Sequence, residues 1–311
     1  MLRVMRFSLE QIETFLTVME LGTVTAAAAR LNLSKSVVSK RVTEFEATIG
    51  AALFRRNAGR IQPTEAALRL AERLRPALGA LVAATEGAGL QSDGAVVLRG
   101  SLSIAAPMSF GTMFLSPILA RFAKAHPQLD IRVDYDDRAR DLMRDGFDLG
   151  IRIGTPKDNS LMMRKLCVDQ QVVVASPDYL AAHGAPQALA ELQDHQILGY
   201  THLTDSAMWQ FQQNGQAVSP RVAGRITLNN GEAIRDMAIA GLGLGILPRF
   251  IVAAALRQGR LQQVLAQYQT REMPVMAVWP PILPMPSKLR LLIDHLAQEL
   301  AGGAPWGGDQ R

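Results

Sequence analysis

The chain has 311 residues, of which 48% are hydrophobic and 20% charged, and its formal net charge is +5. This length exceeds one ordinary hydrophobic core, and the composition excludes a disordered or membrane-spanning protein, so we expect two or three globular domains. The start, "MLRVMRFSLEQIETF", lacks the continuous apolar segment of a signal peptide, and the longest apolar run, "AIAGLGLGILP" from Ala238, is too short to cross a bilayer. We therefore expect a cytoplasmic protein without a membrane partner.

Positive charge is concentrated in one short part of the chain. Between residues 30 and 60 there are seven basic residues and only two acidic ones, whereas the remainder is balanced. A local excess of this kind is typical of a surface that binds a polyanion such as nucleic acid. A solvated charged face that only keeps the protein soluble would have the same composition.

Three helices are predicted within the first fifty residues. Ser8 and Gln11 have the spacing of a capping box at the start of the first helix, and Gly22 ends it. Thr23 can cap a short second helix, and Ser34 can cap the third after the turn "LNLS". Three helices with this tight turn form a helix-turn-helix, in which the last helix enters the major groove of DNA by its N-terminal end.

The third helix, "KSVVSKRVTEFEATI", has one apolar face and one basic, hydroxylated face. Its apolar positions recur at helical spacing and are expected in the core: Val38, Val42, Phe45 and Ile49. Small or hydrogen-bonding side chains on the other face fit a DNA groove, and cations beside them meet phosphates. The following segment, "GAALFRRNAGRIQPT", predicts a wing with its turn at Asn57 to Gly59 and with Arg56 and Arg60 as phosphate contacts.

The first seventy residues resemble the LysR-type transcriptional regulators. The family pattern is present as "FLTVMELGTVTAAAARLNLSKSVVSKRVTEFEATIGAALFRRNAGRIQPTEAA", with helices, turn, wing and the following threonine at family spacing. The family usually has glutamine where Lys35 and Arg41 stand, so this helix is more basic than usual. We assign the contacts with double-stranded promoter DNA to Ser34, Lys35, Ser36, Val37, Ser39, Lys40, Arg41, Arg56 and Arg60.

The segment from Thr64 onward predicts a long linker helix. Apolar residues recur in a heptad-like stripe that is expected to form the dimer seam: Ala67, Ala71, Leu74, Leu78 and Leu81. The alternative is a single amphipathic helix that lies on its own domain, and Pro76 can kink it. The resemblance implies an antiparallel dimer of linker helices, hence a homodimer or a dimer of dimers. The glycine-containing segment after the helix, up to residue 98, is expected to be a hinge.

The remaining two-thirds alternate strand-like and helix-like segments, which predicts parallel sheets covered by helices. The resemblance to the LysR-type regulators implies that this part is a two-lobed, periplasmic-binding-protein-like effector domain. The expected fold class is α/β multidomain: a winged helix-turn-helix at residues 1–64, a linker at 65–98 and the effector domain at 99–301. Lobe I is expected at about 99–168 plus 275–301, and lobe II at about 169–274. Residues 302–311, "GGAPWGGDQR", are expected to form a disordered tail.

A small-molecule effector is expected between the two lobes. In "AAPMSFGT" a predicted strand ends and a helix begins, which is where open α/β sheets bind ligands and where free amides favour anions. By resemblance, Ser109 is the candidate for an effector carboxylate, although it could simply cap the helix. The complete set of candidate effector residues is Met108, Ser109, Phe110, Gly154, Thr201 and Gly245.

Three other functions are less well supported. An enzyme is disfavoured because the five histidines have no metal-ligand spacing, His195 and His202 included, and the single cysteine, Cys167, is expected to be a buried inert thiol. No metal and no cofactor are predicted. A transport protein would need export, and a nucleoid protein would have little use for a sensing domain. RNA polymerase becomes a partner only if the protein activates transcription.

Overall fold

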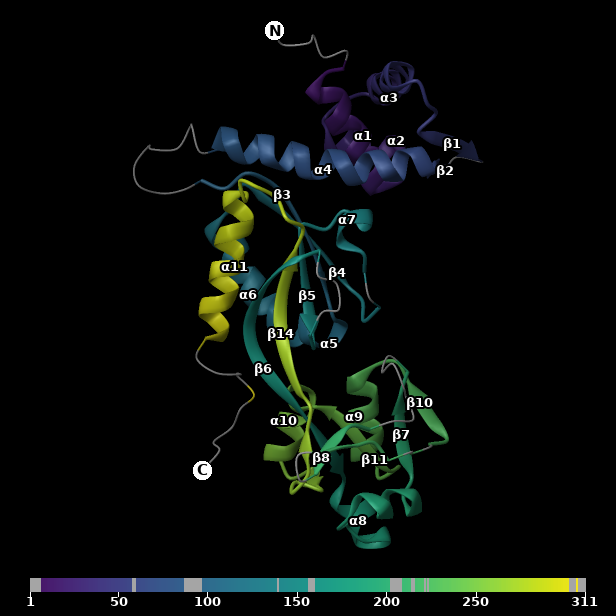
Figure 1. Cartoon of the computed structure of the whole chain (residues 1–311), viewed down its shortest axis with the longest axis vertical. Helices are drawn as coiled ribbons and strands as arrows, with labels where there is room; N and C mark the ends of the chain where they lie inside the picture. Colours follow the sequence, from purple (N-terminus) through teal and green to yellow (C-terminus); the bar gives the residue numbers. More distant parts are fainter. Residues whose placement is uncertain are drawn as a thin grey trace. The chain divides into compact units, whose positions relative to one another are not determined.

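The computed structural model describes residues 7–57, 60–86, 97–138, 140–155, 160–201, 209–213, 216–220, 222, 224–301 and 306 (Figure 1). The chain divides into two compact units. Unit 1 comprises Met1–Val97, Arg140–Asp148 and Pro280–Ser287, and unit 2 comprises Leu98–Ala139, Leu149–Trp279 and Lys288–Arg311. Among the residues described, none of the helices combines the length and apolar character needed to span a bilayer.

Unit 1 begins with three capped helices: α1 at Leu9–Leu21, α2 at Val24–Arg30 and α3 at Lys35–Ile49. The capping box predicted at Ser8 and Gln11 is present, and the left-handed Gly22 ends α1. The Thr23 side chain caps α2 and the Ser34 side chain caps α3, as the sequence predicts. The start of each helix is therefore encoded locally.

The apolar face of α3 holds unit 1 together. Val38 and Phe45 are fully buried, and the Phe45 ring lies 5.5 Å from the Phe15 ring of α1. Ile49, which was expected in the same core, is instead 37% exposed at the end of the helix. The wing follows as the antiparallel strands β1 (Phe54–Asn57) and β2 (Arg60–Pro63), and then comes the long helix α4 (Glu65–Glu86), which is continuous through Pro76.

Unit 2 consists of two lobes joined by long strands. Lobe I has the parallel strands β3 (Gly100–Ala106), β4 (Leu129–Tyr135) and β5 (Leu149–Ile153). Its helical segment runs without a break through α5 (Met108–Phe110), the π-helical turn η1 (Gly111–Leu115) and α6 (Ser116–Ala125). Helix α11 (Ser287–Leu300) packs against α6, where Nη2 of Arg121 lies 2.6 Å from Oε2 of Glu299.

Strands β6 (Met162–Ala175) and β14 (Glu272–Trp279) run antiparallel to each other from one lobe to the other (Figure 1). In the described part of the chain they complete one mixed nine-stranded sheet, ordered β10-β7-β11-β6-β14-β5-β3-β4, with β12 (Gln262–Val264) paired to β6. The predicted parallel sheets are therefore correct for pairs such as β3 and β4, whereas the crossing strands pair antiparallel because the chain passes between the lobes twice.

Lobe II is built on β7 (Ile197–Tyr200), β10 (Ile226–Leu228) and β11 (Leu244–Pro248). Its helices are α8 (Pro177–His183), the 3-10 helix η2 (Leu189–Asp194), α9 (Gly231–Ile239) and α10 (Arg249–Arg257). A small separate sheet contains β8 (Phe211–Gln213), β9 (Gln216–Val218) and β13 (Gln269–Thr270). The apolar core of this lobe surrounds Trp209 and Phe211.

Helix α7 (Leu142–Asp145) is a single turn, which the Asp141 side chain caps and the left-handed Gly146 ends. One expectation about the C-terminal tail needs correction. The tail expected to be disordered contains Trp306, which is 4% exposed because its indole is packed against three aromatic rings. Residues 87–96, which are most of the predicted hinge, and the rest of the tail lie outside the described residues.

Candidate functional site

The N-terminal end of α3 presents a small, exposed polar surface. The hydroxyl of Ser34 accepts a hydrogen bond from the Val37 N–H (3.3 Å) and contacts the Ser36 hydroxyl (2.8 Å). Lys35 and Ser36 are exposed, and Val37 is 37% exposed. This end of the helix therefore has the slim, hydrogen-bonding character that entry into a DNA groove requires.

Lys40 and Arg41 are adjacent but differ in their surroundings. The Lys40 ammonium group is exposed and has only a loose contact with Glu44, at 3.8 Å. The Arg41 guanidinium is less exposed and forms an ion pair with Glu10 of α1. Arg41, which was expected to contact DNA, is thus engaged within unit 1 because its position on α3 faces α1. Ser39 is half-buried.

Glu46 joins the end of α3 to the wing, a role that the sequence does not reveal. Its Oε1 accepts hydrogen bonds from the backbone N–H groups of Leu53 (2.8 Å) and Phe54 (3.1 Å). These hydrogen bonds fix the start of β1 relative to α3. In β1 and β2 the backbone pairs Arg56 with Ile61 and Asn57 with Arg60, whereas the side chains of Arg56 and Arg60 lie outside the described part.

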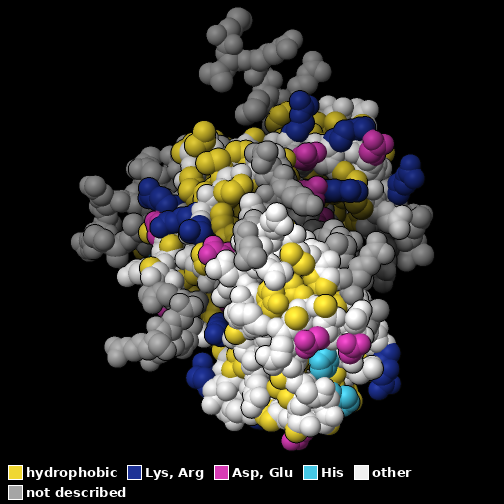
Figure 2. All heavy atoms as spheres, turned by 60° about the horizontal axis from the view of Figure 1, so that its bottom comes forward, with side chains coloured by type: hydrophobic (Ala, Val, Ile, Leu, Met, Phe, Trp, Pro, Cys, Tyr) yellow, Lys and Arg dark blue, Asp and Glu magenta, His cyan; other side chains and the backbone are white. Residues whose placement is uncertain are grey.

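Figure 2 turns lobe II forward and shows a face made mostly of apolar and uncharged atoms, with few Lys and Arg side chains among those described. At the start of α3, in contrast, Lys35 and Lys40 are both exposed within six residues.

The apolar stripe of α4 faces the core of its own domain. Ala67 and Ala71 are fully buried against Phe15 and Phe45, and Leu74 and Leu78 pack on the same cluster. The expectation that Ala67 and Ala71 form a dimer seam is therefore wrong, because the helix buries these residues within its own chain. Leu81, in contrast, is 42% exposed.

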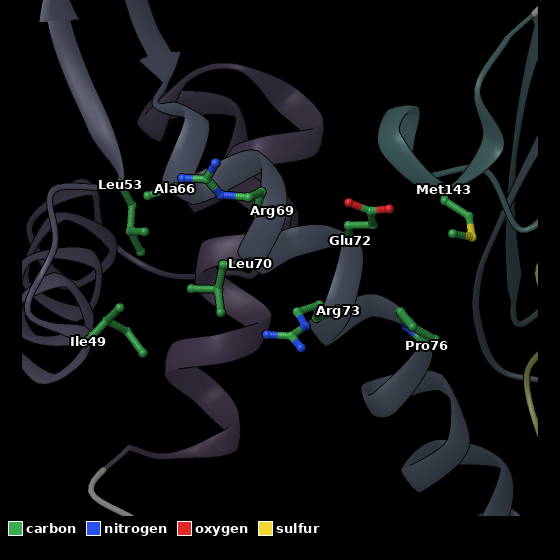
Figure 3. Close-up of a pocket in the computed structure, with 9 residues that line it drawn as sticks. All are labelled: Ile49, Leu53, Ala66, Arg69, Leu70, Glu72, Arg73, Pro76 and Met143. Carbon is green, nitrogen blue, oxygen red and sulfur yellow. The ribbon is translucent and has the colours of Figure 1, made fainter.

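A groove of about 660 Å³ runs beside another face of α4. Figure 3 shows Ile49, Leu53 and Leu70 directed toward it from α3, the wing segment and α4. Met143 of α7 closes the other end, where the Arg75 guanidinium of α4 donates to the carbonyls of Met143 and Arg144 (3.2 Å each). The groove is mainly apolar, and charged side chains of α4 lie along its edge.

In unit 2, Ser109 lies where the two lobes meet. Ser109 is 5% exposed, and its hydroxyl donates to Oε2 of Glu232 in the first turn of α9 (3.0 Å). Beside it, the Met108 N–H donates to Oδ1 of Asp137 (2.8 Å), and the Tyr200 hydroxyl approaches Oδ2 of the same carboxylate (3.4 Å). Burial and the Asp137 carboxylate raise the pKa of Tyr200, which keeps its hydroxyl a proton donor. The carboxylates of Asp137 and Glu232 therefore accept the hydrogen bonds of the Met108 N–H and the Ser109 hydroxyl, which are the donors that we expected to bind an effector.

Sequence reasoning did not identify Asp137, Tyr200 or Glu232. Tyr200 directly precedes Thr201, which was expected at this place, but the Thr201 hydroxyl bonds the Leu228 carbonyl of its own lobe (3.4 Å). Glu232 follows the Asn230 cap of α9, and an acidic residue in a first helical turn was the available signal.

The other candidate residues of the effector site have different surroundings. Met108 is 40% exposed, but the Phe110 ring is buried against Phe250 of lobe II and so does not line an open site. Gly154 has a left-handed backbone and its N–H bonds the Pro274 carbonyl. Gly245 is buried in β11, where a side chain would press on Ile234 of α9 (3.2 Å), which accounts for the glycine by packing alone.

Of the titratable residues singled out in the sequence, the structure describes Cys167 and His195. Burial raises the pKa of the half-buried Cys167 thiol to about 12, so the thiol stays protonated and unreactive. His195 contacts the Tyr179 hydroxyl (3.2 Å), while His202 lies outside the described residues. Over the described ranges, no three His, Cys, Asp or Glu residues are grouped as metal ligands would be.

Both parts of the chain match known families. Residues 9–68 match the bacterial regulatory helix-turn-helix protein, lysR family, and residues 95–301 match the LysR substrate binding domain. The chain is a LysR-type transcriptional regulator. Proteins of this family bind DNA through the helix-turn-helix, carry an effector-binding domain and are not enzymes.

Full-length relatives share this organisation. The regulator is 32% identical over 301 residues to the HTH-type transcriptional regulator PtxR of Pseudomonas aeruginosa, covering 96% of this chain and 95% of the relative. It is 31% identical to DmlR of Escherichia coli, with 96% of each chain covered. The structure of CrgA, a LysR-type regulator from Neisseria meningitidis, superposes with a TM-score of 0.60 at 28% identity over 94% of this chain and 99% of that one. The predicted fold class, with a periplasmic-binding-protein-like effector domain, is thereby confirmed.

Proposed function

We propose that this regulator acts in the cytoplasm as a homodimer or a dimer of dimers on an approximately two-fold symmetric promoter site. The observation that carries the proposal is the N-terminal end of α3. Lys35, Ser36 and Lys40 are exposed there, and the helix, capped by Ser34, belongs to a domain of a DNA-binding family. Half-site spacing mirrors protein symmetry, so a dimer selects a symmetric operator. RNA polymerase is a partner if the regulator is an activator.

The dimer contact proposed here uses a face of α4 next to the buried stripe. Ala66, Leu70, Arg73 and Ala77 follow one another at spacings of four and three, the heptad pattern of a helix pair. Ala77 and Arg73 are exposed, whereas Ala66 and Leu70 are half-buried, pack against the core of unit 1 and line the groove shown in Figure 3. A second copy of α4 would cover the exposed Ala77 and the side of Leu70 that faces the groove.

The effector is proposed to be a small anionic metabolite that replaces Glu232 at Ser109. A carboxylate of the protein already accepts the Ser109 hydroxyl, so this donor is suited to a carboxylate ligand. In the described part of the chain neither Glu232 nor Asp137 lies in an ion pair, and both repel an incoming anion. The anion therefore has to displace Glu232. This displacement would break the hydrogen bond between α5 of lobe I and α9 of lobe II and so change the arrangement of the two lobes.

The experiment is a footprint of the purified protein on the DNA upstream of its own gene, at two salt concentrations. Salt has to be varied because phosphate contacts release counterions and make affinity strongly salt-dependent. The expected result is an extended, two-fold symmetric protected region that persists at the higher salt. Diffuse protection that disappears at higher salt would contradict specific recognition of this DNA, and a genome-wide binding map would then be needed to find an operator.

A further inference from the structure

Trp306 is surrounded by aromatic rings from both lobes. Its ring centroid lies 4.4 Å from that of Phe114 in η1, 5.9 Å from Phe110 in α5 and 5.6 Å from Phe250 in α10. The interplanar angles are 62°, 87° and 61°, which are the edge-to-face arrangements that aromatic pairs prefer. Phe110 and Phe114 also contact Phe250 directly, at 5.7 and 5.8 Å. We call Phe110, Phe114 and Phe250 the aromatic box.

The polar edge of the indole meets a buried carboxylate. Nε1 of Trp306 donates to Oδ1 of Asp169 at 2.5 Å, and Asp169 lies on β6, one of the two strands that join the lobes. Asp169 is 3% exposed, and within the described structure its Oδ2 accepts no hydrogen bond. A buried carboxylate without enough partners is costly, so this place favours an occupant that brings a donor.

Of residues 302–311 the structure describes Trp306 alone. Its described contacts with the aromatic box and with Asp169 are all made by the indole group, which is one flat aromatic system with a single N–H donor. The site offers ring edges and one acceptor, and its negative charge disfavours carboxylates.

We propose that the aromatic box and Asp169 form a second ligand site, separate from Ser109, which binds a flat aromatic N–H donor such as indole and which the chain's own Trp306 occupies here. The two sites are distinct because consecutive residues of α5 serve them: the Ser109 hydroxyl faces Glu232, while the Phe110 ring faces the aromatic box. An external ligand would compete with the C-terminal segment for a place where both lobes meet. This inference does not depend on the effector proposed at Ser109.

The first test is rescue of Trp306→Gly by indole. The variant is expected to melt at a lower temperature than the wild type, and millimolar indole should restore much of the loss while leaving the wild type nearly unchanged. Indene has the same shape but no N–H, so it should bind at least about fivefold more weakly, as expected for the loss of one hydrogen bond to a charged group. Trp209→Gly is the matched control, since Trp209 is equally buried in the lobe II core. Absence of rescue, equal rescue by indene, or equal rescue of Trp209→Gly would each overturn the proposal.

A second test uses the wild-type chain and so does not require the variant to fold. Chymotrypsin cleaves after aromatic residues, and Trp306 is protected while its side chain is buried. Saturating indole should displace Trp306 and increase the rate at which residues 307–311 are released, measured by mass spectrometry, whereas indene at the same concentration should have a smaller effect. A cleavage rate that indole leaves unchanged, together with no rescue of Trp306→Gly, would mean that the box only packs a structural tryptophan.

Discussion

Lys40 and Arg41 show how one position along a helix changes the role of a cation. Both belong to the basic excess of α3, but Lys40 is exposed and only loosely paired, whereas Arg41 is held by Glu10 of α1. An exposed pair such as Lys40 with Glu44 contributes only about 0.3–0.5 kcal/mol, so Lys40 can leave it for DNA at little cost. Arg41 would have to break a contact that joins two helices.

Lys40→Ala is expected to weaken operator binding by about 1–3 kcal/mol and to relax the preference at one base position. Arg41→Ala is the matched control, since it removes the same charge one residue away. It should mainly lower the free energy of unfolding, by about 0.2–1 kcal/mol for a pair near the surface. Binding of both variants to operator and to random DNA, measured across salt concentrations, checks this. Equal losses on both DNAs for Lys40→Ala would remove its base-reading role.

Asp169 is expected to make stability depend on pH. Burial raises its pKa to about 6, against the opposing influence of backbone N–H groups, the Trp306 indole and Arg249. Because the folded state then holds a proton that the unfolded state releases, stability should decrease as pH rises from about 4 to about 6 and remain reduced above that. The difference from the ordinary value of 3.8 corresponds to about 3 kcal/mol.

The measurement compares urea unfolding of the wild type and Asp169→Asn between pH 4 and pH 7. The variant carries no titrating group at this place, so its stability relative to the wild type should improve as pH rises. Asp130→Asn, at an exposed position of β4, serves as the control and should follow the wild type. Parallel curves for the wild type and Asp169→Asn would show that Asp169 does not titrate in this range.

At the scale of single elements, α4 carries two apolar faces with different roles. The face with Ala67 and Ala71 completes the core of the DNA-binding unit, where these small residues pack with Phe15 and Phe45. The neighbouring Leu70 packs against the same core and also borders the groove of Figure 3. A helix that serves its own domain on one face and a second copy on another would couple the DNA-binding units of a dimer.

Ala77→Glu is expected to weaken dimerisation by at least about 100-fold, because a carboxylate would be buried without a partner in the helix pair, whereas in the single chain this position is exposed. Light scattering during size-exclusion chromatography over a concentration range measures this. Leu9→Glu is the control, since Leu9 is an exposed apolar residue of the same unit, 49% accessible, outside the groove. An unchanged dimer in Ala77→Glu would place the interface elsewhere.

At the scale of the whole effector domain, two crossing strands and a few side-chain contacts relate the lobes. Strands β6 and β14 pass from lobe I to lobe II, and the bond from Ser109 to Glu232 joins α5 to α9 beside them. A ligand can change the relation of the lobes only as far as it binds one arrangement more tightly than another. A ligand that displaces Glu232 meets this condition directly.

Glu232→Gln is expected to raise the affinity for small carboxylates, by roughly tenfold, because it removes one repelling charge and weakens the competing acceptor on Ser109. Titration of wild type and variant with a panel of carboxylates and amines, followed by melting temperature, tests the sign. Glu272→Gln is a control at an exposed position of β14. Loss of binding to amines in Glu232→Gln, with no gain for carboxylates, would show that the effector is cationic.

The sequence by itself determined the local structure of unit 1 and the family. The caps at Ser8, Thr23 and Ser34 are short-range signals, since each side chain bonds a backbone N–H within three residues, and the α3 pattern sets its buried face. Only the tertiary structure decided which partner each face and charge would meet. Arg41 with Glu10, the α4 stripe with its own core, Ser109 with Glu232 and Trp306 with Asp169 all join residues far apart in the chain, and periodicity carries no information about such pairings.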